Sequence, residues 1–168
     1  MSSSNACAAL EDAIIFAVTA HRGQVDRSGV PFIFHCLRVM LAQQDDATRI
    51  AAVLHDVAED TAYSLEDIVQ AGFSAEICAA VAVLTRRGGE PYESYIERVA
   101  VDRLARSVKL ADLADNMDPQ RLPVGDSGAE ARMTRYKLAC ERLSAPQMGA
   151  RHMDESDWKE GDPNGHSS

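Results

Sequence analysis

The sequence predicts an all-α fold on three observations. Apolar residues recur at three- and four-residue spacing along much of the chain, as on the buried face of a helix. Residues that start or end helices separate these segments. No segment alternates apolar and polar residues in the convincing way that a half-buried strand requires. With 168 residues, 46% of them hydrophobic, the chain is long enough for one domain with a sizeable core.

Three helices are expected in the first part of the chain. The first covers about residues 6–20 and is followed by a loop dense in turn residues. The second covers about residues 32–43. Either Asp45 or Asp46 can cap the third helix, which is expected over about residues 46–60.

The later helices are expected from similar signals. Ser64 and Asp67 resemble a capping box for a short helix, and Ser74 can cap the next one. A further helix begins near Tyr92, after a loop that contains two glycines and a proline. The remaining expected ranges are about 65–72, 75–85, 101–117 and 129–143.

Composition excludes several classes of protein. The net charge of −9 disfavours a nucleic-acid-binding surface, which needs a basic face to neutralise phosphates. The four cysteines form no C-x-x-C pair, so a zinc ribbon is not expected. No apolar run approaches the length of a membrane span, and the first residues lack a basic signal-peptide start. A cytoplasmic protein that binds neither membrane nor nucleic acid is therefore expected.

The third helix contains ionisable residues where an apolar face is expected. His55, Asp56, Glu59 and Asp60 interrupt a run of small and branched apolar residues, and no basic residue accompanies them. In a continuous helix, four-residue spacing would place Glu59 beside His55 and Asp60 beside Asp56. Burying such groups is costly unless they are paired or bind a metal. The alternative is a histidine that caps a core helix whose acids lie at its solvated end, which this burial cost disfavours.

Two other segments supply further candidates. His35 lies between apolar residues and is expected to point inward. A single inward histidine is more often a core residue than a ligand, but the second one at His55 favours a metal site. Asp112 lies in the middle of a helix, one turn after Lys109 and one turn before Asn116. The alternative for this segment is a solvated salt bridge from Asp112 or Asp115 to Lys109 or Arg106.

Together these residues predict a metal centre. His35, His55, Asp56 and Asp112 could converge on one divalent ion from three packed helices. Nitrogen and carboxylate ligands without thiolate suit manganese, iron or zinc, and the oxygen content favours Mn²⁺. Such an ion would activate water and polarise a phosphate, and Glu59 and Asp60 lie where they could shuttle protons.

Four stretches of the chain resemble a known family. An adjacent His-Asp pair on a helix, with an upstream histidine and a distant aspartate, resembles the HD superfamily of metal-dependent phosphohydrolases. The closer resemblance is to the hydrolase domain of RelA/SpoT-type enzymes and to small alarmone hydrolases. It is carried by AHRGQ (20–24), SGVPFIFH (28–35), LHDVAEDT (54–61) and VKLAD (108–112), and it ends at NM (116–117).

The resemblance implies a helical bundle that removes the 3′-pyrophosphate from a guanosine alarmone, ppGpp or pppGpp. It also implies Mn²⁺ ligation by the four residues above, with Glu59 and Asp60 as the acid/base pair that positions the attacking water. Asn116 would contact the nucleoside. Arg22, Arg27 and Lys109 are the candidates to hold phosphates, with Arg86 and Arg87 as weaker candidates, although each could instead be a solvated surface charge.

Two departures from the family pattern keep other substrates open. Asp26 stands where the family usually has a basic residue, and Asp118-Pro119 follows Asn116-Met117. An adenosine alarmone such as ppApp, or another phosphorylated nucleotide, is therefore an alternative substrate, and a nucleotide-sensing module without turnover is a third possibility. The domain is expected over residues 1–143, followed by a polar, disordered tail over 144–168.

Overall fold

The computed structural model describes residues 3–121 and 127–146 of the chain. Within these ranges the protein is all-α, as predicted, and its one β-type pairing is an isolated bridge between Val25 and Pro31. The helices in chain order are α1 (Ser3–Ala20), α2 (Ile33–Leu41), α3 (Asp46–Leu54), α4 (Val57–Asp60), α5 (Leu65–Gln70), α6 (Ala75–Leu84), α7 (Tyr92–Val101), α8 (Arg103–Asn116), the 3₁₀ turn η1 (Pro119–Arg121) and α9 (Ala129–Ser144).

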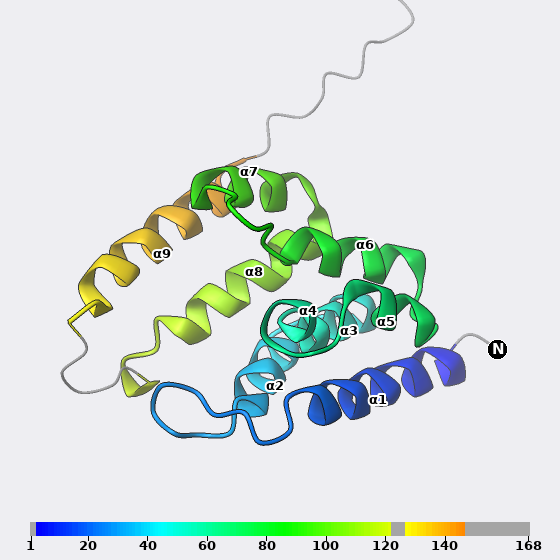
Figure 1. Ribbon diagram of the computed structural model, residues 1–168. Coiled ribbons are helices and arrows are strands. Elements are labelled where there is room, and N and C mark those ends of the chain that lie inside the picture. Colours follow the sequence, from blue (N-terminus) through cyan, green and yellow to red (C-terminus); the bar gives the residue numbers. More distant parts are fainter. Residues whose placement is uncertain (1–2, 122–126, 147–168) are drawn as a thin grey trace, which may run out of the picture.

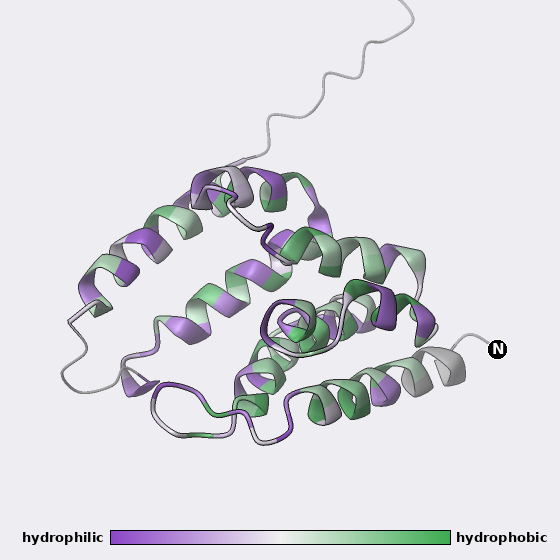
Figure 2. Ribbon diagram, in the orientation of Figure 1, coloured by the Kyte–Doolittle hydropathy of each residue, from purple (hydrophilic) through white to green (hydrophobic). Residues whose placement is uncertain are grey.

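Helix α3 is the centre of the packing. It contacts α1, α2, α6 and α8, while α9 packs on the outside against α7 and α8 (Figure 1). Every residue of α3 from Ile50 to Leu54 is buried. Figure 2 shows the corresponding difference in composition, since α6 is largely hydrophobic whereas hydrophilic and hydrophobic residues alternate along α9. In agreement with this difference, α6 buries Ile77, Ala80, Val81 and Leu84, whereas α9 buries only Ala139 and Leu143 among its described side chains.

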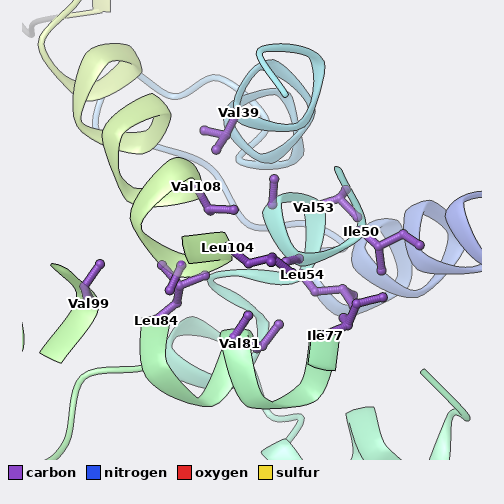
Figure 3. Packing of buried hydrophobic residues seen from close by; sticks show 14 of the residues in the cluster. Val39, Ile50, Val53, Leu54, Ile77, Val81, Leu84, Val99, Leu104 and Val108 are labelled. Atoms are coloured by element: carbon purple, nitrogen blue, oxygen red, sulfur yellow. The ribbon is translucent and has the colours of Figure 1, made fainter. Parts of the chain in front are cut away.

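Leu54 lies where three helices meet. Its side chain is fully buried, and Figure 3 shows it close to Leu104 of α8 and above Val81 of α6. We expect Leu54→Ala to lower the free energy of unfolding by about 2–5 kcal/mol, because truncation removes apolar contacts and leaves a cavity. Urea unfolding followed by circular dichroism measures this. Leu41→Ala is the control, because Leu41 is 72% exposed. Equal losses in both variants would contradict the assignment of Leu54 to the core.

Capping chemistry behaves largely as the sequence predicts. The side chain of Asp45 accepts a hydrogen bond from the Thr48 N–H at 2.9 Å, so Asp45 is the cap of α3. Ser64 and Asp67 form the capping box of α5, and the side chain of Ser74 caps α6. These motifs involve residues three apart in sequence, which is why they can be read without tertiary information.

Two predicted helix boundaries are wrong. The helix expected over 46–60 is interrupted at His55 and Asp56, which separate α3 from α4. The Ala52 carbonyl, which a continuous helix would offer to the Asp56 N–H, accepts hydrogen bonds from Nδ1 of His55 at 2.7 Å and from its N–H at 3.4 Å. This competition from a side chain ends α3, so the expected four-residue rows on one continuous helix do not exist.

The helix expected over 101–117 starts later. Val101 belongs to α7, and Asp102 has an extended backbone with φ −94° and ψ 123°. Its side chain accepts a hydrogen bond from the Ala105 N–H at 2.8 Å, which makes it the cap of α8. A capping aspartate inside a continuous apolar pattern is easily mistaken for an interior helical residue.

The other organisational expectations concern the termini and the membrane. Helix α9 ends at Ser144, and residues 147–168 of the predicted tail lie outside the described residues. No helix in the described part of the chain has the length and apolar character that crossing a bilayer requires.

Candidate metal centre

The two histidines and two aspartates predicted as ligands lie together. Helix α2 supplies His35, the turn between α3 and α4 supplies His55 and Asp56, and α8 supplies Asp112. Donor atoms of His35, His55 and Asp56 all lie within 4.8 Å of one another. These elements are neighbours because α2, α3 and α8 pack against each other (Figure 1).

The ring nitrogens Nε2 of both histidines face the two carboxylates. Nε2 of His55 lies 3.0 Å from Oδ2 of Asp56 and 3.8 Å from Oδ1 of Asp112. Nε2 of His35 lies 3.6 Å from Oδ2 of Asp56 and 3.2 Å from Oδ1 of Asp112. Two nitrogen and two carboxylate donors therefore converge on one small volume.

The other ring nitrogen of each histidine is held by an acceptor. Nδ1 of His55 donates to the Ala52 carbonyl at 2.7 Å, and Nδ1 of His35 donates to Oδ2 of Asp115 at 2.6 Å. Since neither acceptor can donate, both Nδ1 atoms carry the hydrogen, and the Nε2 atoms are left to bind a metal. Nε2 of His55 is buried and, although it lies 3.0 Å from Oδ2 of Asp56, it makes no hydrogen bond of acceptable geometry with the described residues. This donor set fits a divalent transition-metal ion.

The electrostatics of the cluster also call for a cation. Burial lowers the pKa of His35, but hydrogen bonds with Asp112, Asp115 and Asp56 outweigh it and raise the pKa to about 11. Burial likewise lowers the pKa of His55, while the charges of Asp56 and Asp112 raise it to about 9. The extra protons neutralise the buried carboxylates, and a divalent ion would supply that positive charge in their place.

Asp112 has two further partners on its own helix. Lys109 donates to Oδ2 at 2.7 Å, and Asn116 donates to Oδ1 at 2.5 Å. Lys109 also lies over the ring of Tyr95, with 5.2 Å from Nζ to the ring centroid. The sequence offered a solvated salt bridge between Lys109 and Asp112 as the alternative to a metal site. The salt bridge exists, but it is buried, because the two side chains are only 15% and 5% exposed.

Lys109 is therefore expected to matter for stability. Lys109→Met should lower the free energy of unfolding of the metal-free protein by about 3–5 kcal/mol, because it removes the buried ammonium group that pairs with the Asp112 carboxylate. Chemical denaturation measures this, with Arg106→Met on the same helix as the control. A protein of unchanged stability that bound its substrate more weakly would instead support the sequence-based prediction that Lys109 holds phosphate.

The predicted acid/base residues lie on the short helix α4. Both Glu59 and Asp60 are exposed, and Oε2 of Glu59 accepts a hydrogen bond from the Arg86 N–H at 3.0 Å. The pKa of Asp60 is raised to about 6, mainly by partial desolvation and to a smaller extent by the negative charges of Asp56 and Glu59. Solvent still reaches the side chain. A carboxyl group with a pKa near neutrality can both accept and donate protons.

A cavity of about 260 Å³ adjoins the cluster. Asn116, which donates to Asp112, lines it, and so does Phe32, whose ring centroid lies 5.4 Å from that of His35. Of the predicted substrate-binding residues, Arg27 and Asn116 belong to this lining, whereas Lys109 does not. The remaining lining residues are Gln24, Val25, Asp26, Arg121, Arg132 and Tyr136.

Sequence reasoning missed two residues that contact the cluster. The sequence offers Asp115 only as a salt-bridge partner for Lys109 or Arg106, but in the structure its carboxylate accepts a hydrogen bond from His35. Arg121 donates to Asp115 and lies 3.3 Å from Oδ2 of Asp26. One signal for Asp115 was its position one turn after Asp112, on a similar face of α8.

Comparison with known proteins places these residues in a family. The family described as HD domain matches residues 13–113, which contain His35, His55, Asp56 and Asp112. The chain is a member of the HD domain family. Its all-helical fold and its adjacent His55-Asp56 pair agree with that assignment.

Relatives of this HD domain are found among longer enzymes. The chain is 36% identical over 125 residues to a GTP pyrophosphokinase of Streptomyces coelicolor, covering 67% of this chain and 15% of the relative. It is 35% identical over 122 residues to the bifunctional (p)ppGpp synthase/hydrolase SpoT of Escherichia coli, covering 64% and 17%. The HD domain thus spans less than a fifth of the length of these curated relatives.

A solved structure covers nearly the whole fold. It is described as a metazoan ortholog of SpoT that hydrolyses ppGpp and has a role in starvation responses. The HD domain matches it with a TM-score of 0.66 and 26% identity, over 81% of this chain and 83% of that one. The resemblance recognised in the sequence is confirmed by these comparisons.

Proposed function

We propose that the protein is a Mn²⁺-dependent hydrolase that removes the 3′-pyrophosphate from ppGpp or pppGpp. The observation that carries this proposal is the convergence of His35, His55, Asp56 and Asp112 beside a cavity lined by arginines. The relatives support it, since they include SpoT and a metazoan ortholog of SpoT that hydrolyses ppGpp.

In this proposal His35, His55, Asp56 and Asp112 would hold the metal, with Nε2 of each histidine and one oxygen of each aspartate as the available donors. When bound, the ion would supply Lewis acidity toward a phosphoryl group and toward water. The oxygen content of the ligand set favours Mn²⁺. Asn116 and Lys109 keep Asp112 oriented through their hydrogen bonds to its two oxygens.

Proton transfer falls to the two carboxylates of α4. Glu59 is oriented by the Arg86 N–H, so that its carboxylate can accept a hydrogen bond from the attacking water. Asp60, with a pKa of about 6, can hold the proton near neutral pH.

The cavity would hold the nucleotide. Arg27, Arg121 and Arg132 line it, and guanidinium groups bind phosphate oxygens through paired donors. This local positive charge permits an anionic substrate despite the net charge of −9. Tyr136 and Phe32 offer aromatic surfaces to a base, and Asn116 offers an amide to the nucleoside.

A substrate panel tests the proposal. The protein is incubated with ppGpp, pppGpp, ppApp and ordinary nucleotides, with Mn²⁺ or with a chelator, and pyrophosphate release is measured. We expect release from ppGpp and pppGpp only with the metal. Preferential turnover of ppApp would replace the guanosine substrate with the adenosine alternative. Tight binding without turnover of any compound would contradict hydrolysis and support a nucleotide-sensing module.

A further inference from the structure

Asp115 receives hydrogen bonds from two residues of α2 and from one residue of η1. Its Oδ2 accepts from Nδ1 of His35 at 2.6 Å, and its Oδ1 accepts from Nε of Arg38 at 2.6 Å. Arg121 donates to the same Oδ2. The carboxylate is 11% exposed, so it is nearly enclosed by these donors.

The contact with His35 fixes the ring in two respects. A carboxylate accepts but does not donate, so the hydrogen of the ring must lie on Nδ1 and Nε2 must face Asp56 and Asp112. The same contact restrains rotation of the ring, which reduces the conformational entropy that would be lost when a metal ion binds. Without it, Nε2 would have to be oriented by the metal itself.

His55 needs no such residue. Its Nδ1 is held by the carbonyl of Ala52, three residues earlier in the last turn of α3. The orientation of His55 is therefore set by its own segment, whereas that of His35 depends on a side chain 80 residues away on α8.

We propose that Asp115 is a positioning residue that presents His35 to the metal, an inference that rests on the proposed function. Arg121 connects this residue to the cavity, because its guanidinium touches both Asp115 and Asp26. Asp26 also accepts hydrogen bonds from the Ser28 and Val30 N–H groups, which fold the loop between α1 and α2. Figure 1 shows this loop reaching the end of α8, where η1 carries Arg121.

A purely structural role for Asp115 predicts a different outcome. Arg38 also lies on α2, and its ion pair with Asp115 could simply attach α2 to α8. If that were the whole role, Arg38→Ala and Asp115→Ala would weaken metal binding equally. If the contact with His35 matters, Asp115→Ala should weaken it much more.

Metal titration separates the two roles. Mn²⁺ binding to the full chain is measured by the electron paramagnetic resonance signal of free Mn²⁺, and unfolding of the metal-free proteins is measured in parallel. We expect Asp115→Ala to raise the Mn²⁺ Kd about 10- to 100-fold, the range found when a residue that hydrogen-bonds a metal ligand is removed. Arg38→Ala should raise it less than about 3-fold, since His35 and Arg121 still hold the carboxylate.

Two further variants complete the test. Asp115→Asn keeps an oxygen that can accept from Nδ1, so its Kd should lie between those of the wild type and Asp115→Ala. Glu97→Gln is the matched control, because Glu97 pairs with Arg142 on α7 and α9, away from the cluster. Visible spectra of the Co²⁺-loaded proteins report the ligand geometry and should change for Asp115→Ala alone.

The inference is overturned if Asp115→Ala and Arg38→Ala have the same Mn²⁺ Kd. It is also overturned if Asp115→Ala binds Mn²⁺ weakly and Asp115→Asn binds it no more tightly. In either case a wild-type protein that binds Mn²⁺ and hydrolyses ppGpp leaves the proposed function standing. Absence of Mn²⁺ binding in the wild type itself would overturn both.

Discussion

The Asp56→Asn protein is expected to lose both the metal and turnover. Oδ2 of Asp56 lies 3.0 Å from Nε2 of His55 and 3.6 Å from Nε2 of His35, so the carboxylate joins both histidines. Asparagine has nearly the same shape but lacks the negative charge. We expect the Mn²⁺ Kd to rise more than about 100-fold, above the 10- to 100-fold effect of residues that merely support ligands. Hydrolysis of ppGpp should become undetectable.

Asp46→Asn provides the matched control for this experiment. It makes the same chemical change at the start of α3, where Asp46 pairs with Arg49 at the surface and its side chain is 43% exposed. Metal titration and pyrophosphate release are measured on both variants, with circular dichroism to show that each is folded. Turnover by Asp56→Asn at the wild-type rate would remove the basis for the metal centre.

Glu59→Gln is expected to bind the metal normally and to lose rate. Glu59 lies on α4, outside the four clustered side chains, and its contact is with the Arg86 N–H. Glutamine can still accept that hydrogen bond, so the local structure should persist, but it cannot take a proton. The expected loss in kcat is about 10²- to 10⁴-fold, the usual contribution of a positioned general acid or base.

The decisive comparison is between metal affinity and rate. Glu76→Gln, an exposed glutamate in the first turn of α6, is the control and should be unaffected in both. A Glu59→Gln protein with reduced Mn²⁺ affinity would show that Glu59 acts as a ligand. A protein with unchanged kcat would transfer the proton role to Asp60 alone.

Local chemistry accounts for what could be predicted. The capping groups of Asp45, Ser64 and Ser74 act on residues three positions away, so the chain itself displays them. The prediction of a metal centre came from the cost of burying histidine and aspartate in apolar surroundings, which depends only on residue type and pattern. The structure brings His35 and Asp112 together with the His55-Asp56 pair, as that reasoning required.

Competition between side chains and the backbone explains the boundaries that were missed. His55 uses the Ala52 carbonyl and so ends α3, and Asp102 caps α8 inside an apolar run. Both positions satisfy helical periodicity, which records where apolar residues fall but not which donor reaches a given acceptor.

The sequence by itself determined the helical class, most of the helix starts and the four side chains that gather at the candidate metal centre. Only the tertiary structure decided that Asp115 holds His35, that Arg121 reaches Asp26, and that Lys109 lies buried against Asp112 rather than in the cavity lining. The physical reason is the range of the interactions. The contacts of Asp115 and Arg121 with His35 and Asp26 join residues 80 and 95 positions apart, and their partners are fixed by how α2, α8 and the α1–α2 loop pack.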